Sequence, residues 1–195
     1  YICIPNLFSL NLQAISLKRI GLVCKPKRSE NMRNRHNPQY WGKTAAGILF
    51  TCEADNTMML MYRSRYVDQP HTWGIPGGSV VGEGHYDSEE MSEKEYEDEM
   101  LWEGAQTEVY EECGSLPPRL RHAEIVTEID YRDGSFLYRN FVVNITLSQK
   151  REWHIDIKNA PDAWENEGWD WFDVNRLPTP LHFGTIYLLE KLDIL

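Results

Sequence analysis

The stretch that decides the fold begins with Trp73-Gly74-Ile75-Pro76-Gly77-Gly78 and ends with Thr107-Glu108-Val109-Tyr110-Glu111-Glu112-Cys113-Gly114. Its second part has helical spacing, because Ala105, Val109 and Cys113 recur every four residues with Trp102 on the same side. Gly114 supplies the left-handed residue that commonly follows a helix. We therefore predict a helix that ends at Gly114.

Three carboxylates, Glu108, Glu111 and Glu112, stand at positions i, i+3 and i+4 of this predicted helix. They share one face, where like charges repel by about 0.2–0.5 kcal/mol per pair, so a cation between them would be stabilised. Oxygen ligands suit a hard ion such as Mg²⁺ or Mn²⁺. The alternative for the acidic triplet alone is a solvated face.

The first part of the stretch predicts a tight loop over residues 75–78. Pro76 cannot lie inside a helix, and Gly77 and Gly78 allow another group to approach the backbone closely. The backbone of such a loop can face a phosphate or a metal.

Together these residues resemble the Nudix box, G-x5-E-x7-R-E-U-x-E-E-x-G-U, in which U is apolar. Gly77 with Glu83 matches its opening, and its close is matched by Glu108, Val109, Glu111, Glu112 and Gly114. The resemblance extends over about residues 40–192. It implies an α/β (α+β) protein with the Nudix fold, a mixed β-sheet sandwiched between helices. It also implies Mg²⁺ or Mn²⁺ as cofactor, held by the three glutamates and the Gly77 carbonyl.

The box departs from the family pattern in three places. Twenty-three residues separate Glu83 from Thr107 where the family has seven, so about sixteen are inserted. Thr107 stands where the family has the Arg that helps to hold the carboxylates, and Ser115 replaces an apolar residue. The insertion, residues 84–103, carries nine acidic residues against Lys94 alone. We predict a solvated loop or a short exposed helix, which could act as a lid.

Length and charge bound the remaining possibilities. A chain of 195 residues supports one domain with an extra arm, here residues 42–195 and 1–41. The net charge of −10 argues against a nucleic-acid-binding surface, although nucleotide-sized anions can bind through a metal. The four cysteines show no paired spacing and no apolar run is long enough to span a bilayer. These features predict a cytoplasmic protein without a membrane partner, and they leave a homodimer open.

The arm has the opposite charge to the rest of the chain. It carries seven basic residues and one acidic residue, for a net charge of +6, which leaves −16 for the body. We expect the arm to fold back on the acidic body; the alternative is an anionic partner.

Two short strands are predicted at residues 44–52 and 57–62, with a turn at residues 53–56. Arg63 and Arg65 follow them and are candidates for contacting a substrate phosphate, because guanidinium pairs bidentately with phosphate oxygens; the alternative is a solvated side chain. Trp73 can stack on a base or cap the core. Gly78 is a substrate-binding candidate through its backbone.

The C-terminal part predicts strands at residues 123–131 and 135–147 with a hairpin turn at 132–134, a strand at 169–174 and a helix from about residue 181. The layout again resembles Nudix proteins, in which a glutamate on the loop before the last strand is the general base or a further metal ligand. By its spacing to Trp171 this is Glu165, with Glu167 as second choice; the alternative is an exposed loop acid.

The resemblance implies hydrolysis of the pyrophosphate bond of a nucleoside diphosphate linked to another moiety. The substrate stays open between a nucleotide sugar, a dinucleoside polyphosphate and a nucleoside triphosphate. Tyr131 is a substrate-binding candidate, because a tyrosine at its place resembles the dinucleoside polyphosphate branch; the alternative is an ordinary strand tyrosine. The rival function is a catalytically silent nucleotide-binding module, which Thr107 and the insertion favour and the intact glutamates oppose.

Overall fold

The central strand, β1 (Thr44–Cys52), is a nearly continuous run of apolar and small residues, which suits a strand covered on both faces. Its residues 45–50 are all buried. The one-turn helix η3 (Glu53–Asp55) and the left-handed Asn56 reverse the chain into β2 (Thr57–Arg63). The strand–turn–strand prediction for this segment is confirmed.

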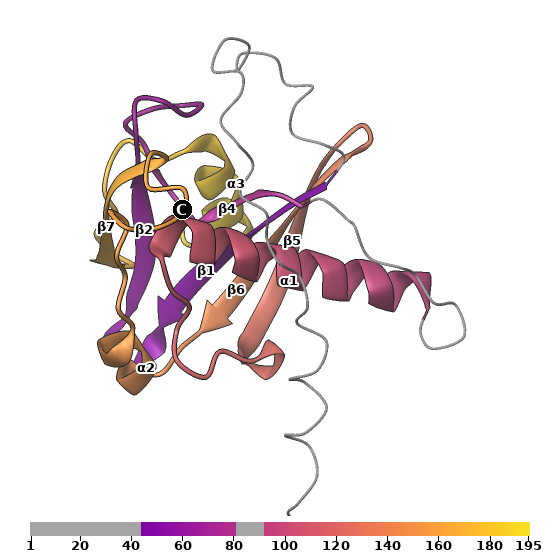
Figure 1. Ribbon diagram of the computed structural model, residues 1–195, viewed down its shortest axis with the longest axis horizontal. Coiled ribbons are helices and arrows are strands. Elements are labelled where there is room, and N and C mark those ends of the chain that lie inside the picture. The colour runs from indigo at the N-terminus through magenta and orange to yellow at the C-terminus, as the bar shows by residue number, and fades with distance from the viewer. Residues whose placement is uncertain (1–43, 81–91) are drawn as a thin grey trace, which may run out of the picture. The chain divides into compact units, whose positions relative to one another are not determined.

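The computed structural model describes residues 44–80 and 92–195 (Figure 1). These residues all belong to the second of two units into which the chain divides, His36–Leu195. The basic arm and Glu83 lie outside the described residues, so the expectations about the arm and the opening of the box remain predictions.

The described residues form a mixed sheet of seven strands. Five follow the order β3-β2-β1-β6-β5, while β4 pairs with β1 and β7 pairs with β2. The β1–β6 pair is parallel and the other pairs are antiparallel. The remaining strands are β3 (Trp73–Gly74), β4 (Gly77–Ser79), β5 (Ile125–Asp133), β6 (Phe136–Asn144) and β7 (Asn166–Asp173). Strands β1 and β2 pair at only two positions, Thr51 and Cys52 of β1, and β4 pairs with the other end of β1.

Helices cover both faces of this sheet, as Figure 1 shows for α1 (Glu93–Cys113) and α3 (Phe183–Lys191). On one face Ile48, Phe50 and Phe141 pack with Val109 and Cys113 of α1. On the other, Leu49, Leu60 and Val142 pack with Leu188 and Leu189 of α3. The predicted arrangement of a mixed sheet between helices is confirmed.

Helix α1 is longer than the predicted box helix. It begins at a capping box, in which Ser92 and Glu95 exchange side-chain and backbone hydrogen bonds, and it ends at Gly114 with φ 76°. Residues 93–103 of the predicted insertion therefore form the first turns of α1, which corrects the expectation of a loop or a separate short helix. Residues 84–91 lie outside the described part of the chain.

Two smaller differences appear near the C-terminus. The strand predicted to reach residue 147 ends at Asn144, because Thr146 and Gln149 form a capping box that starts α2 (Leu147–Glu152). Strand β7 begins at Asn166, three residues before the predicted start. That shift brings Asn166 into the sheet.

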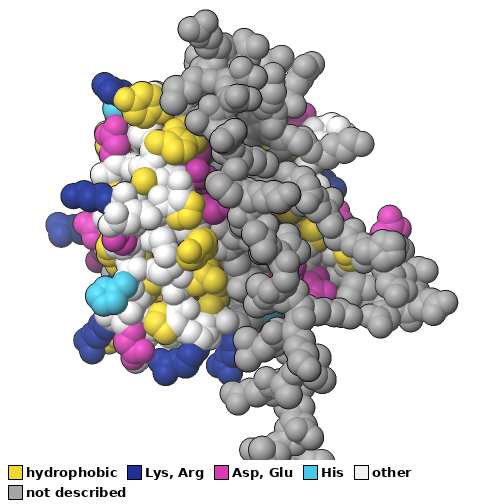
Figure 2. Space-filling view, in the orientation of Figure 1, with side chains coloured by type: hydrophobic (Ala, Val, Ile, Leu, Met, Phe, Trp, Pro, Cys, Tyr) yellow, Lys and Arg dark blue, Asp and Glu magenta, His cyan; other side chains and the backbone are white. Residues whose placement is uncertain are grey.

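The surface charge and the apolar character of the helices are relevant to the partners expected from the sequence. Lys and Arg side chains gather along the lower edge of the face drawn in Figure 2, so the acidic net charge is not spread evenly. Across residues 44–80 and 92–195, no helix combines the length and the apolar character that crossing a bilayer requires. Cys52 and Cys113 are buried free thiols, and Cys113, the last residue of α1, packs in the core between this helix and the sheet.

Candidate active site

Gly77 and Gly78 begin β4 and follow a short turn from β3, in the gap where β1 and β2 diverge. Pro76 accepts a hydrogen bond at 3.0 Å from the backbone N–H of Ile48, and Gly77 pairs with Gly47 of β1. The Tyr138 hydroxyl lies close to Gly47 and Gly77: a Cβ at Gly47 would lie 2.5 Å from this hydroxyl. The predicted close backbone approach is confirmed, but the loop is shorter than predicted, because Gly77 and Gly78 already belong to β4.

Glu112 is the most buried of the three box carboxylates, with 5% of its surface exposed. Its Oε1 accepts the backbone N–H of Gly77 at 2.8 Å, and its Oε2 accepts the Asn166 side-chain amide at 2.6 Å. Burial and the carboxylate of Glu165 raise the pKa of Glu112 to about 8, although both hydrogen bonds act in the opposite direction. The loop glycine and the helix carboxylate are therefore joined directly.

Glu108 lies one turn earlier on α1, with its carboxylate against the backbone of Gly78. Burial raises its pKa to about 9, and four further carboxylates add to this effect: Glu112, Glu111, Glu165 and Asp162. Five acidic side chains from α1 and the loop before β7 thus act on one partly buried region.

The loop before β7 is fastened at both ends. Asp162 donates its backbone N–H to the Glu111 carbonyl at 2.8 Å, and Ser64 donates its own to the Glu165 carbonyl at 2.8 Å. Glu165 acts electrostatically on both Glu108 and Glu112, whereas Glu167 acts on Arg65. Of the two predicted loop glutamates, the structure brings the first choice, Glu165, to the carboxylates.

Thr107 does not contribute to this group of carboxylates. Its side chain is exposed, and its hydroxyl donates to the Glu103 carbonyl one turn earlier at 3.0 Å. The position that holds Arg in the family pattern therefore supplies no cation here.

Arg63 and Arg65 differ in their surroundings. Arg63 donates two hydrogen bonds to the Asp68 carbonyl, at 2.9 and 3.1 Å, and its charge lowers the pKa of Glu112. Arg65 lies over the ring of Tyr66, 4.8 Å from its centroid. Arg63 is thus the arginine that acts on the carboxylate site.

The aromatic candidates occupy two different places. Trp73 packs between Tyr62 and Phe172, with ring centroids 5.0 and 4.7 Å away, which is the core-capping alternative. Tyr131 packs against Tyr187 of α3 at 5.2 Å and Phe183 at 6.4 Å, and Phe183 is 51% exposed. An exposed aromatic edge therefore lies beside Tyr131 and not beside Trp73.

Three residues of the site escaped the sequence interpretation. Asn166 holds Glu112, and Ser64 holds the loop that carries Glu165. Tyr138 comes close to Gly77, and burial together with Glu112 and Glu108 raises the pKa of its hydroxyl. No local motif marks any of them, although the Glu165-Asn166 pair in a predicted catalytic loop could have drawn attention to Asn166.

The donor set fits a hard divalent cation in its chemistry. Among the described residues, no three His, Cys, Asp or Glu side chains already converge at ligand distances. Mg²⁺ does not require such a cage, because it keeps several waters and takes one or two carboxylates plus substrate oxygens. Burial and, after it, repulsion by the surrounding carboxylates raise the pKa of Glu108, and a cation would relieve the repulsion.

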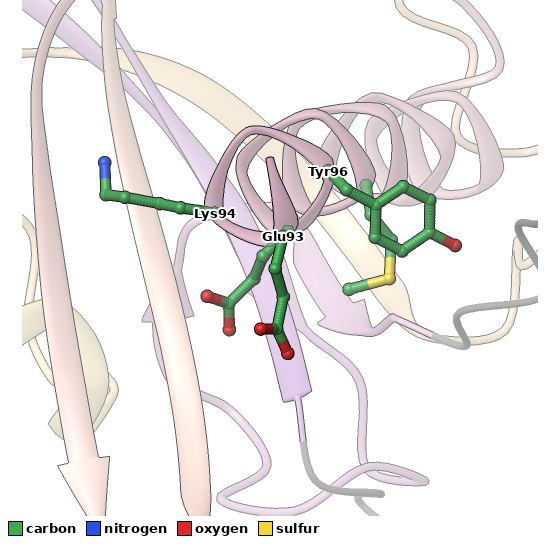
Figure 3. A pocket seen from close by; sticks show the side chains of 5 residues that line it. Glu93, Lys94 and Tyr96 are labelled. Carbon is green, nitrogen blue, oxygen red and sulfur yellow. The ribbon is translucent and has the colours of Figure 1, made fainter. Parts of the chain in front are cut away.

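A hollow elsewhere on α1 lies apart from this chemistry. Figure 3 shows it beside the first turns of the helix, lined by Glu93, Lys94, Tyr96, Glu97 and Met100. None of the five box and loop carboxylates borders it. We assign it no part in the site.

Comparison with solved structures finds similar chains, one of which has a TM-score above 0.5 and supports the same fold. The MutT Nudix hydrolase from Burkholderia pseudomallei is 18% identical over 76% of this chain and 96% of its own, with a TM-score of 0.52. The Caenorhabditis elegans Ap4A hydrolase binary complex is 16% identical over 76% and 95%, with a TM-score of 0.49. The MutT protein from Methanosarcina mazei Go1 is 17% identical over 77% and 91%, also with a TM-score of 0.49.

Comparison with curated proteins finds no match. A family model, described as the NUDIX domain, matches residues 42–192, which include the whole carboxylate site. The chain therefore belongs to the Nudix family, and its enzyme class is that of a hydrolase acting on pyrophosphate bonds.

Proposed function

We propose that this protein hydrolyses the pyrophosphate bond of a nucleoside diphosphate linked to another moiety, with Mg²⁺ or Mn²⁺ held by Glu108, Glu111 and Glu112. The observation that carries the proposal is the meeting of these carboxylates with Glu165 and Asp162 around one partly buried region beside Gly77 and Gly78. A silent module has no need of so many adjacent carboxylates.

The metal would supply charge neutralisation for the diphosphate and a more acidic water. The protein's own part is to hold the carboxylates in place, since catalysis of phosphoryl transfer consists mainly of positioning and electrostatic stabilisation. Gly77 fixes Glu112 through its N–H, and the backbone of Gly78 leaves room for Glu108. The Gly77 carbonyl is proposed as a further ligand.

Glu165 is proposed as the general base. Its backbone is fastened to Ser64, and its charge reaches both Glu108 and Glu112. A carboxylate in this position can accept a proton from a water that attacks the substrate phosphorus.

Substrate contacts are proposed at the edge of the sheet next to the carboxylates. Arg63 acts electrostatically on Glu112 and is therefore the preferred candidate for a phosphate contact, whereas Arg65 faces Tyr66. Tyr131 with the exposed Phe183 offers an aromatic surface on which a nucleobase could stack. A nucleotide sugar, a dinucleoside polyphosphate and a nucleoside triphosphate are the substrate classes to compare.

The test is incubation with Mg²⁺ and one compound of each class in ¹⁸O-labelled water, with the products identified by mass spectrometry. We expect cleavage between two phosphorus atoms, with one label in one of the two phosphate products. Tight binding of a nucleotide without cleavage of any compound would overturn the proposal in favour of a silent binding module.

A further inference from the structure

The carboxylate of Glu112 is held from two sides. The Gly77 backbone donates to Oε1 at 2.8 Å and the Asn166 amide donates to Oε2 at 2.6 Å. Glu112 and Asn166 are 5% and 6% exposed, so water does not compete freely for either contact. The first donor comes from the box loop, and the second comes from outside the box.

A β-bulge brings Asn166 to this place. Tyr62 pairs with Gly168, but the next residue, Arg63, pairs with Asn166, so the register skips Glu167. Regular antiparallel pairing would have continued with Glu167 opposite Arg63. Because neighbouring strand residues alternate between faces, skipping one residue changes which side chain points to a given face. The bulge therefore re-aims one side chain, as bulges near active sites do, and puts an amide where a carboxylate would otherwise stand.

Ser64 fixes the backbone just before Asn166. Its hydroxyl donates to the Trp164 carbonyl at 2.7 Å, and its N–H donates to the Glu165 carbonyl at 2.8 Å. Ser64 is 2% exposed. The two residues that precede Asn166 are thus tied to the end of β2, which limits how far its amide can move from Glu112.

The Asn166 amide lies in a site without the arginine that the family pattern has at the position of Thr107. Thr107 is exposed and bonds to its own helix, so it orients none of the carboxylates. An amide donor fixes a carboxylate without neutralising it, whereas an arginine would do both. The Asn166 amide therefore sets the orientation of Glu112 without adding a positive charge that would compete with a metal.

We propose that Asn166 is a positioning residue that fixes the Glu112 carboxylate for the divalent metal. The inference rests on the proposed function, because it requires Glu112 to be a metal ligand. It acts through Glu112 and needs no contact between Asn166 and the substrate. Outer partners of metal ligands typically change metal affinity by about 10- to 100-fold when they are lost.

The test measures Mg²⁺ binding by calorimetry without substrate. Asn166→Leu keeps the branched shape and removes the donor, Asn166→Ala removes the donor and most of the side chain, and Asn166→His restores an N–H donor with a ring that is a poor ligand for Mg²⁺. Asn175→Ser is the matched control. Asn175 is exposed in the turn after β7, and its backbone and side-chain N–H groups donate hydrogen bonds to Asp173, two residues earlier. Melting temperatures in a chelator show which variants fold.

We expect Asn166→Leu and Asn166→Ala to weaken Mg²⁺ binding about 10- to 100-fold, with kcat largely recovered at saturating Mg²⁺. The His variant should regain part of the affinity and Asn175→Ser should match the wild type. Unchanged Mg²⁺ affinity in either folded donor-less variant would overturn the positioning role alone. Absence of Mg²⁺ binding in the wild type, both without substrate and with a non-hydrolysable nucleotide present, would overturn the proposed function as well.

Discussion

The carboxylate of Glu108 lies directly against Gly78, such that a Cβ at Gly78 would come within 2.8 Å of Glu108 Cδ. Any residue other than glycine at position 78 would push the Glu108 carboxylate away from the other carboxylates of the site. Gly78 of β4 and Glu108 of the helix are therefore fitted to each other, although they lie 30 positions apart in the chain.

Gly78→Ala should consequently lower activity at limiting Mg²⁺, because it displaces Glu108. Gly168→Ala is the control, since a Cβ there meets nothing nearer than Tyr62 Cβ at 3.7 Å. We expect at least about a tenfold loss of kcat/KM for the first variant, equal to about 1.4 kcal/mol, and a small change for the second. Equal activities in a steady-state assay would contradict the fit described above.

Glu108→Gln should stabilise the metal-free protein at high pH. The pKa of Glu108 in the folded state, about 9, lies above the 4.5 of a glutamate in the unfolded chain. Between these values the folded state binds more protons than the unfolded state, so stability falls as pH rises from about 5 to 9. Gln removes this penalty, which we put at about 1–3 kcal/mol at pH 8.

The measurement is urea unfolding in a chelator at pH 5 and pH 8. The two proteins should have similar stability at pH 5 and diverge at pH 8, and Mg²⁺ should stabilise the wild type more than the variant. The same pH slope in both proteins would show that Glu108 is not a buried, repelled carboxylate.

Asp98→Ala should destabilise the domain, because Asp98 ties the first turns of α1 to the sheet. It pairs with Arg139 of β6, whose side chain is 9% exposed and is also held by Asp130 at 2.8 Å. Loss of one partner of a nearly buried arginine costs about 1–2 kcal/mol. Lys94→Ala is the control. Lys94 pairs with Asp98, but its side chain is 83% exposed, and exposed ion pairs contribute about 0–1 kcal/mol.

Thermal unfolding of the two variants decides this prediction. If both melt at the wild-type temperature, the first turns of α1 do not support the fold, and the sequence interpretation of a merely solvated insertion holds.

The comparison of Asp98 with Glu112 shows what the sequence can reveal. The spacing of Glu108, Glu111 and Glu112 is local, so one helix places them, and apolar runs likewise identify β1 and β2. Asp98 appears as one more solvated acid because its partner, Arg139, lies 41 residues away. Composition alone therefore does not reveal that Asp98 ties α1 to the sheet.

Asn166 was missed for a related reason. Its side chain reaches Glu112 only because of a register shift between β2 and β7, and strand pairing over about one hundred residues leaves no local pattern. Helix α2 was missed because its capping residues, Thr146 and Gln149, follow the end of an apolar strand directly.

Thr107→Arg should lower the Mg²⁺ concentration needed for half-maximal activity by a few-fold. A guanidinium at this position would add an orienting cation near the carboxylates, and its fork geometry should outperform Thr107→Lys. Because Thr107 is exposed and Arg has the better helix propensity, stability should change by no more than about 0.5 kcal/mol. A Mg²⁺ titration of the rate that coincides with that of the wild type would show that Arg at this position contributes nothing to orientation.

The most direct test of the central claim is the rate of pyrophosphate-bond hydrolysis by Glu112→Gln at saturating Mg²⁺, with circular dichroism to confirm the fold. Gln keeps the shape of Glu112 but cannot supply an anionic ligand, so we predict a loss of at least about 100-fold, the scale of effect of removing one electrostatic stabilising group. The wild type should lose activity to the same extent in a chelator and recover it with Mg²⁺. A folded Glu112→Gln protein that hydrolyses its substrate at the wild-type rate would contradict the assignment of the box carboxylates as the metal site.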